Sequence, residues 1–271
     1  MKYNELRNEI KKYYKIASYE NAQKHLENGT KKLNELYNEN MSSYDMKVLQ
    51  YKIITDMIEP VLFENAPFYY ETGIIPGFSD GSRDYHGNKH IGGWTYQKNF
   101  QKFIDQDPEL WELSCRQRNE LFYLICGAYN DDAQHFLVNY RPIFEKGLKG
   151  VCKEAQEALN GADDAREKQF LSAVCEGLLC VKRIGEKFAD KADELLKTHP
   201  GNKNLKRIST SARRCPWEKP RSFYEALNTY AFMRKVIGSL EGIGPNSFGR
   251  VDMDLQPFYE ADIKCGRMTK D

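Results

Sequence analysis

The sequence predicts a helix-rich fold with few short strands, and three features of the 271 residues support this prediction. Apolar side chains recur every three and four residues over long stretches, which is the period of an amphipathic helix. After Pro108 the next ninety residues contain a single proline, Pro142. Hydrophobic residues make up 41% of the chain, which is enough apolar side chain to offset the conformational entropy lost on folding.

The first 59 residues are expected to be helical and polar. Asn28-Gly29-Thr30 predicts a break between two helices, with Thr30 as the N-cap of the second. Ser42 or Ser43 is expected to cap a third helix. That helix should stop before Pro60, because the residue before a proline disfavours helical backbone.

Residues 60–107 differ in kind, because glycine, proline and aromatic residues are concentrated there. We expect an irregular loop region that is either functional or wedged into the interior of the domain. Asp80, Asp84, His86 and His90 lie close together in this region, but they lack any standard metal-ligand spacing. A polar structural loop is therefore favoured over a metal site.

Helices are expected again over 108–199. Asp107 is a candidate N-cap, and Pro108 suits the first helical position. Two amphipathic patterns follow, from Phe144 to Leu159 and from Phe170 to Leu196, with Asn160-Gly161 between them. The second pattern should end at 198–201.

Residues 201–271 are expected to hold a connector, a capped helix and the start of a further segment. Residues 201–221 are strongly basic, which indicates either an anion or nucleic-acid patch or a solvated segment whose charge is balanced elsewhere. The second interpretation is favoured, because Trp217 is the one interleaved aromatic residue. Ser222 and Glu225 predict a capping box for a helix that ends near Gly242.

The last stretch is expected to begin with an irregular turn or short strand over 244–252. A further helix should open at Gln256-Pro257. Thr269 has the character of an N-cap whose helix is missing, which we take as an indication of truncation. The apolar inner face of such an incomplete fold should cause self-association or poor solubility.

Charge and cysteine content exclude several classes of protein. Lys and Arg total 40 against 39 Asp and Glu, which argues against nucleic acid or an anionic membrane as the main partner. The seven cysteines are odd in number and have no C-x-x-C spacing, so they are expected to be buried thiols in a reducing compartment. No apolar run is long enough to span a membrane and the amino terminus lacks a secretory signal, so we expect a cytoplasmic protein.

Three segments near the end of the chain carry a family resemblance. Residues 220–228 read P-R-S-F-Y-E-A-L-N, residues 247–252 read S-F-G-R-V-D, and residues 257–270 read P-F-Y-E-A-D-I-K-C-G-R-M-T-K. In order and spacing they resemble the pyruvate formate-lyase family of glycyl radical enzymes. The resemblance implies the amino-terminal portion of a ten-stranded α/β barrel, and a formate C-acetyltransferase-like transferase or dehydratase-like lyase of anaerobic metabolism.

The same resemblance implies a radical-bearing glycine and a thiyl-forming cysteine, and no residue of this sequence matches either one. The family bears its radical on a glycine in an Arg-Val-x-Gly context, but Arg250-Val251-Asp252-Met253 lacks that glycine. Cys265 lies outside the position of the thiyl-forming cysteine. We therefore expect no catalytic residue and no bound cofactor in this chain, which would contribute barrel wall and substrate contacts and be inactive alone.

The resemblance also implies partners and substrate contacts. The radical would be installed by an S-adenosylmethionine iron-sulfur activase. A small-molecule substrate is expected, with either a homodimer or a complementing downstream polypeptide. Ser247 and Arg250 are the candidate substrate contacts, and His90 is a weaker match. For Ser247 a role in capping a turn stays open, and for Arg250 an ion pair with Asp252 or Asp254 is the favoured alternative.

Two other classes of function remain open from the sequence. A non-catalytic helical interaction module, or a degenerate paralogue that binds a partner, would show the same missing motifs. A helical nucleic-acid binder would use the basic stretch 201–221.

Overall fold

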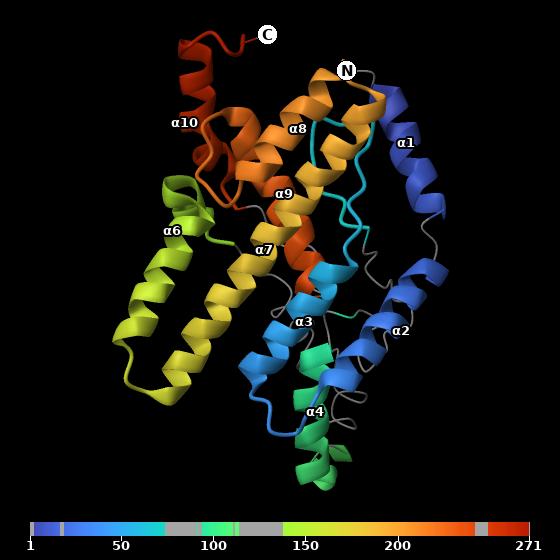
Figure 1. Ribbon diagram of the computed structural model, residues 1–271, viewed down its shortest axis with the longest axis vertical. Helices are drawn as coiled ribbons and strands as arrows, with labels where there is room; N and C mark the ends of the chain where they lie inside the picture. The colour runs from blue at the N-terminus through green and yellow to red at the C-terminus, as the bar shows by residue number, and fades with distance from the viewer. Residues whose placement is uncertain are drawn as a thin grey trace.

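A computed structural model describes residues 3–16, 19–73, 91, 94–110, 112–113, 138–241 and 249–270 (Figure 1). The helices are α1 (Tyr3–Ile16), α2 (Tyr19–Leu36), α3 (Ser43–Met57), α4 (Trp94–Gln106), α6 (Tyr140–Gly161), α7 (Ala165–Thr198), α8 (Lys203–Arg214), α9 (Phe223–Glu241) and α10 (Val251–Lys264). Within the described ranges the sole β contact is an antiparallel bridge between Val61 and Glu71. The expected helix-rich fold is confirmed.

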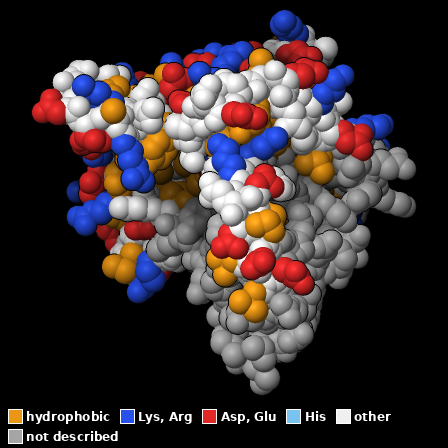
Figure 2. Space-filling view, turned by 90° about the horizontal axis from the view of Figure 1, so that it is seen from below, with side chains coloured by type: hydrophobic (Ala, Val, Ile, Leu, Met, Phe, Trp, Pro, Cys, Tyr) orange, Lys and Arg blue, Asp and Glu red, His pale blue; other side chains and the backbone are white. Residues whose placement is uncertain are grey.

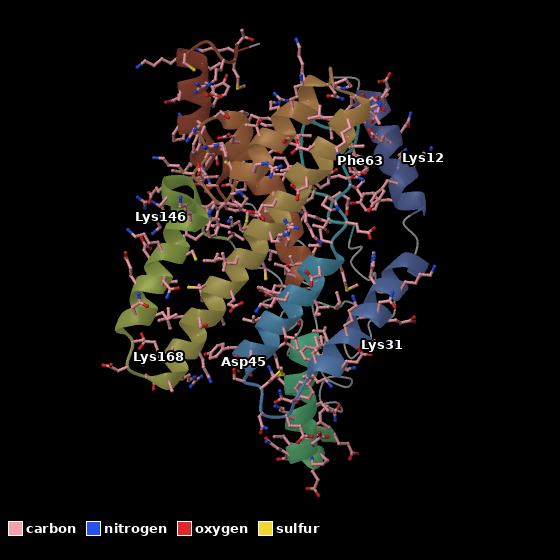
Figure 3. The ribbon with its side chains drawn as sticks, in the orientation of Figure 1. Lys12, Lys31, Asp45, Phe63, Lys146 and Lys168 are labelled. Atoms are coloured by element: carbon pink, nitrogen blue, oxygen red, sulfur yellow. The ribbon has the colours of Figure 1, made fainter. Side chains whose placement is uncertain are left out.

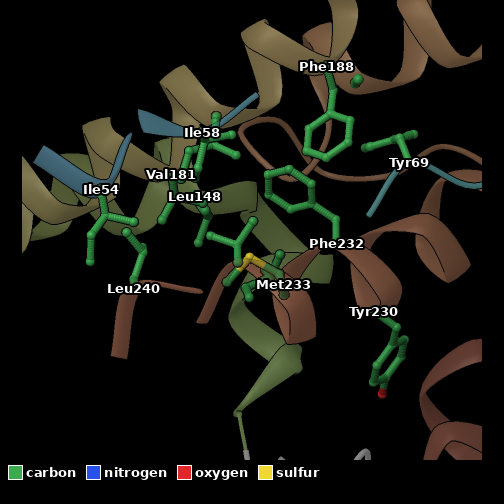
Figure 4. Close-up of a cluster of buried hydrophobic side chains, with 14 of the residues drawn as sticks. Ile54, Ile58, Tyr69, Leu148, Val181, Phe188, Tyr230, Phe232, Met233 and Leu240 are labelled. Carbon is green, nitrogen blue, oxygen red and sulfur yellow. The ribbon is translucent and has the colours of Figure 1, made fainter. Parts of the chain in front are cut away.

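Helix α7 is the centre of the arrangement. Helices α3, α6 and α8 all pack against it, and α6 and α7 form the long hairpin on the left of Figure 1. Ile184, Phe188 and Ala192 recur at helical spacing along one face of α7 and are fully buried. Tyr69 and Phe232 meet Phe188 in the core, with ring centroids 5.8 to 5.9 Å apart (Figure 4).

The expected starts of several helices are confirmed by their caps. The Asp45 N–H donates to Ser42 Oγ at 3.1 Å, and the Ser42 N–H donates back to Asp45 Oδ2 at 3.2 Å, which completes a capping box for α3. At Pro108 a helical turn begins, and the Leu110 N–H donates to Asp107 Oδ1 at 2.9 Å. Helix α7 starts earlier than the predicted apolar pattern, after Asp164, which accepts the Glu167 N–H at 2.8 Å.

The expected break at Asn28-Gly29-Thr30 is wrong, because α2 continues through it. A side chain at Gly29 would place its Cβ 1.8 Å from Cδ1 of Ile91. The glycine therefore allows Ile91, which is almost fully buried, to pack directly against the α2 backbone. Close packing, and not helix termination, explains this glycine.

The expectation for residues 60–107 is confirmed in part. Residues 58–73 are irregular and do enter the interior, where Tyr69 is fully buried and its hydroxyl lies 3.1 Å from Ser211 Oγ. The last part of the region is helical and not a loop, because α4 begins at Trp94. Asp80, Asp84, His86 and His90 lie outside the described residues.

Residues 201–221 are not a simple connector, because α8 occupies most of them. Leu205, Ile208 and Ala212 form a buried stripe at helical spacing, which the abundance of basic residues concealed. Acidic groups balance the basic ones: Arg213 pairs with Asp193 at 2.6 Å. Charged side chains of both signs are also interspersed over the described surface in Figure 2.

The capping box expected before α9 is half formed. The Glu225 N–H donates to Ser222 Oγ at 3.2 Å, but the Glu225 carboxylate accepts from the Arg221 N–H instead of that of Ser222. Helix α10 begins at Val251, earlier than expected, and contains Pro257 in its interior. Burial of Leu255 against the core favours the helix there despite the hydrogen bond that proline removes.

The described cysteines are free thiols, as expected. Burial raises the pKa of Cys175, Cys180 and Cys215, so these side chains remain uncharged. Cys265 differs, because it is exposed at the end of α10. No helix in the described part of the chain has both the length and the apolar character needed to cross a membrane.

Lys187 of α7 fixes the end of α3. Its ammonium donates to the carbonyl oxygens of Thr55, Asp56 and Ile58 at 2.7 to 2.9 Å. These are carbonyls that the end of a helix leaves without intrahelical partners. The ammonium satisfies them and sets the direction in which residues 58–73 leave α3.

Gly147 interrupts α6 with a left-handed backbone, φ 70° and ψ 168°. The change of direction lets the Leu148 N–H donate to the carbonyl of Pro216 at 3.0 Å, and the Lys149 N–H to that of Trp217 at 2.8 Å. A Cβ at Gly147 would lie 2.4 Å from Trp217 O. Glycine is required here by both the positive φ and the close approach.

Replacing Gly147 with alanine is therefore expected to destabilise the protein by about 3 kcal/mol, from strain at positive φ and from the overlap with backbone atoms. Urea unfolding followed by circular dichroism measures the change. Gly161→Ala is the matched control: it lies at the end of the same helix, nothing lies within 4 Å of its Cβ position, and its effect should stay below about 1 kcal/mol. Equal effects at the two positions would contradict the explanation.

Candidate functional site

Three parts of the chain meet near the carboxyl end of α9, where α3, α4 and residues 58–73 lie. The fully buried side chain of Gln50 joins α3 to both α9 and α4. Its Nε2 donates to the carbonyl of Leu240 at 2.8 Å. Its Oε1 accepts from the Thr95 N–H at 3.0 Å and from Thr95 Oγ1 at 2.9 Å. One amide therefore holds the end of α9 and the start of α4 together, and we call it the Gln50 clamp.

The final residue of α9 is held from the same helix. Lys47 Nζ lies 2.8 Å from Glu241 Oε2, and the Tyr51 hydroxyl donates to Glu241 Oε1. Both donors come from α3, where Lys47 lies three residues before Gln50 and Tyr51 directly follows it. Helix α3 therefore fixes the point at which the chain leaves α9.

A buried ion pair lies on the neighbouring side of α9. The Glu71 carboxylate is fully buried, and Lys235 Nζ of α9 lies 3.0 Å from its Oε2. The Tyr14 hydroxyl of α1 donates to the same oxygen, and the Gly73 N–H donates to Oε1 at 3.1 Å. A buried carboxylate needs this number of partners, because leaving one unpaired costs several kcal/mol.

The tyrosines around Glu71 stay protonated. Burial raises the pKa of Tyr13 and Tyr14, and the negative charge of Glu71 raises both further. The same two causes raise the pKa of Tyr70 to about 12. The hydroxyls of Tyr13 and Tyr14 are therefore hydrogen-bond donors to Glu71, and none of the three tyrosines is a base at neutral pH.

Residues 58–73 are held along α9 and α1 by further contacts. Thr72 Oγ1 lies 2.7 Å from Ser239 Oγ in the interior. Phe63 packs against Tyr13 of α1 with ring centroids 5.5 Å apart, and Figure 3 shows Phe63 beside α1. Gly73 has φ 75°, and a Cβ there would lie 2.4 Å from the Glu59 carbonyl, so the glycine lets the segment close on itself.

Of the expected substrate contacts, Ser247 and His90 lie outside the described residues. The structure does describe the residues that flank them. Ser247 follows Leu240 by seven residues, and His90 precedes Thr95 by five. Both flanking residues bond to the Gln50 clamp.

Arg250 is described and is engaged with an acidic neighbour. Its Nε and Nη2 donate to the two carboxylate oxygens of Asp252 at 3.1 and 2.9 Å. The hydrogen bonds with Arg250 lower the pKa of Asp252. The ion pair with Asp252 that the sequence offered as the alternative is therefore present, on an exposed surface.

The described residues provide no group of three or more His, Cys, Asp or Glu side chains placed to hold a metal ion. Cys265 Sγ lies 3.5 Å from the carbonyl of Asp262. It belongs to the end of α10 and makes no contact with the Gln50 clamp.

Sequence reasoning missed Gln50, Glu71, Lys235 and Glu241. For Gln50 a signal existed, because it interrupts the buried stripe formed by Met46 and Ile54 at four-residue spacing. A polar residue at such a position needs partners once buried. The sequence does not show which partners those are, since Leu240 lies 190 positions away.

Comparison with proteins of known sequence identifies relatives. Residues 94–271 match the family model described as pyruvate formate lyase-like. A probable dehydratase, YbiW, of Escherichia coli strain K12 is 30% identical over 142 residues, which cover 49% of this chain and 17% of that protein. An isethionate sulfite-lyase of Oleidesulfovibrio alaskensis is 32% identical over 147 residues, with the same two coverages.

Solved structures show the same fold at low sequence identity. A glycyl radical enzyme from Archaeoglobus fulgidus has a TM-score of 0.61 and 16% identity, over 92% of this chain and 36% of that one. The hydroxyproline dehydratase of Clostridioides difficile has a TM-score of 0.64 and 17% identity, over 92% and 35%. The chain therefore spans about a third of the length of these enzymes, whose fold is a ten-stranded barrel, and forms a mostly helical part of it.

The family model covers well over half of the chain, and it includes the three segments that carry the resemblance, which lie on α9, on α10 and between them. The curated relatives are dehydratases and sulfite-lyases, and the structural neighbours include glycyl radical enzymes. This chain belongs to the pyruvate formate-lyase-like family of glycyl radical enzymes.

Proposed function

We propose that this chain is the amino-terminal portion of a glycyl radical enzyme that eliminates water or another small group from a small polar substrate. The family match over residues 94–271 carries this proposal. The names of the relatives favour the dehydratase and lyase branch over acetyl transfer to formate, because they are dehydratases and sulfite-lyases.

The proposed contribution of this chain is part of the barrel wall together with substrate contacts. The Gln50 clamp fixes the ends of the two segments that carry His90 and Ser247. A hydroxyl at Ser247 would hold a substrate oxygen. Arg250 would bind a substrate anion in place of Asp252, since its guanidinium already forms a bidentate pair with a carboxylate.

The radical chemistry would be supplied from outside these residues. No Arg-Val-x-Gly segment occurs in the sequence, and Cys265 belongs to the end of α10. The work of this chain is then orientation, which alone leaves the substrate bond intact. We propose that it is inactive by itself, and that an S-adenosylmethionine iron-sulfur activase installs the radical on a complementing polypeptide or a longer form. The proposed compartment is the cytoplasm, and a homodimer is the proposed assembly.

A non-catalytic interaction module or degenerate paralogue is the alternative. Such a protein would have the same fold and would also lack the radical-glycine and cysteine motifs. It would not depend on a residue that contacts a substrate. Substitutions at Ser247 therefore separate the two proposals. The nucleic-acid alternative has less support, because Arg213 and Arg214 of α8 are paired with acidic side chains.

The chain alone is expected to form no glycyl radical. It would be incubated anaerobically with a purified activase, a reductant and S-adenosylmethionine, and the glycyl doublet sought by electron paramagnetic resonance. The intact hydroxyproline dehydratase of Clostridioides difficile serves as the positive control. A doublet from the chain alone, or product formation that Cys265→Ala abolishes, would overturn this part of the proposal.

A hybrid enzyme tests the substrate contacts. The chain replaces the matched region of the Clostridioides dehydratase, and turnover is measured with trans-4-hydroxy-L-proline, isethionate, glycerol and 1,2-propanediol. With a substrate that the hybrid converts, Ser247→Ala should lower turnover at least tenfold and leave the radical doublet unchanged. Ser209→Ala, which removes an exposed hydroxyl bonded to Asp193, is the control and should do neither. Unchanged turnover in Ser247→Ala would reduce that residue to a turn-capping role.

Removal of the Gln50 clamp should weaken both stability and substrate binding. Gln50→Leu leaves the Thr95 N–H and the Leu240 carbonyl buried without partners, which costs about 3 kcal/mol. The KM of the hybrid should rise, because the segments with His90 and Ser247 lose their shared anchor. Gln101→Leu, at an exposed position of α4, is the matched control and should change stability by less than about 0.5 kcal/mol.

A further inference from the structure

Two cysteines face each other across the hairpin of α6 and α7 (Figure 1). Cys152 lies in the part of α6 that follows Gly147, and Cys175 lies on α7, 23 residues later. The Cys175 thiol donates to the carbonyl oxygen of Cys152, with Sγ 3.9 Å from that oxygen. The two helices therefore bring a pair of thiols together at their interface.

The separation of the two positions suits a disulfide, which joins Cα atoms about 4.4–6.8 Å apart. The axes of packed helices lie about 8–10 Å apart and each Cα lies about 2.3 Å from its own axis, so facing Cα atoms reach that range. The contact of Cys175 Sγ with a main-chain atom of Cys152 places these two positions opposite each other. The hairpin thus holds the two sulfurs where a disulfide can join them.

The two thiols differ in their access to solvent. Cys152 is half-buried, whereas Cys175 is buried. Burial raises the pKa of Cys175, and the neighbouring thiol of Cys152 raises it further. A dissolved oxidant therefore meets Cys152 first, and Cys175 is placed to react second.

We propose that Cys152 and Cys175 form a reversible disulfide that locks the α6–α7 hairpin when a small-molecule disulfide is the oxidant. The thiolate of Cys152 attacks one sulfur of the oxidant, whose S–S bond breaks and releases one thiol. Cys175 then loses its proton and attacks the sulfur of Cys152, which releases the second thiol. Two cysteine thiols are oxidised, the oxidant is reduced to two thiols, and the two protons pass to the leaving sulfurs.

The bond would close a loop over residues 152–175, which contains the end of α6 and the start of α7. The same parts of the two helices line a groove of about 570 Å³ beside α3, with Leu159 on α6 and Ser172 and Ala173 on α7. A crosslink reduces the conformational freedom of the loop that it closes. Oxidation should therefore hold these walls of the groove in one register. This proposal does not depend on the proposed function.

The first experiment maps the bond in the full chain. The reduced chain is incubated with oxidised glutathione, free thiols are blocked with iodoacetamide, and the chain is digested with trypsin and glutamyl endopeptidase. The second enzyme cuts after Glu176 and so separates Cys175 from Cys180. Mass spectrometry should find the peptides of Cys152 and Cys175 joined in at least half of the chains, and dithiothreitol should part them.

Two variants provide the control. Cys175→Ala should abolish the joined peptide and leave glutathione bound to Cys152. Cys180→Ala removes another buried thiol of α7, five residues further on, and should leave the yield of the joined peptide within twofold of the wild type. A wild-type chain that keeps glutathione on Cys152, or that joins Cys152 to a different cysteine, would overturn the proposal.

The second experiment tests the lock itself by amide hydrogen exchange over residues 153–174. Exchange should slow at least threefold in the oxidised wild type relative to the reduced chain, and should not change when Cys175→Ala is oxidised. Equal exchange in the reduced chain and in the joined chain would contradict the lock. Loss of the helical circular dichroism signal on oxidation would also overturn the proposal, because the bond would then belong to an unfolded chain.

Discussion

The close packing of other helices on one face of α7 is the constraint on which the remaining structure depends. Gly185 allows the approach of α8, because a Cβ there would lie 3.0 Å from the Ala212 carbonyl. Ala189 and Ala192, further along the same helix, are fully buried and also have small side chains. With the backbones this close, Phe188 reaches Tyr69 and Phe232, and Lys187 reaches the end of α3. Small side chains on α7 thus admit α8, while Lys187 and Phe188 hold the end of α3 and Tyr69 on the same helix.

The candidate site depends on buried polar groups that connect distant parts of the chain. Gln50 joins α3 to α4 and α9, and Glu71 joins residues 58–73 to α1 and α9. Such groups contribute little net stability when paired, but removal of one partner is costly. They therefore favour one arrangement of α1, α3, α4, α9 and residues 58–73 over others.

Sequence patterns predicted the helices that depend on local signals, and failed where contacts between distant residues decide the structure. The Ser42 cap and the α6–α7 hairpin follow from local chemistry and periodicity. Gly29 was taken as a break, because its contact with Ile91 is not visible in the sequence. The buried stripe of Leu205 and Ile208 is hard to see among basic residues, and the partners of Arg213 on α7 are not visible in the sequence. The family followed from the motifs on α9 and α10, but Gln50 and Glu71 did not.

The left-handed residue at Gly147 divides α6 into two units with different neighbours. Before it, Tyr140 and Phe144 stack on Tyr230 and Phe258, so the first turns move with α9 and α10. After it, residues 148–161 form the arm of the hairpin with α7. In a continuous helix the N–H groups of Leu148 and Lys149 would donate to carbonyls one turn earlier in the helix. Here they donate instead to the carbonyls of Pro216 and Trp217. The start of the hairpin arm is therefore held by the loop that follows α8, whereas the turns before Gly147 are held by α9 and α10.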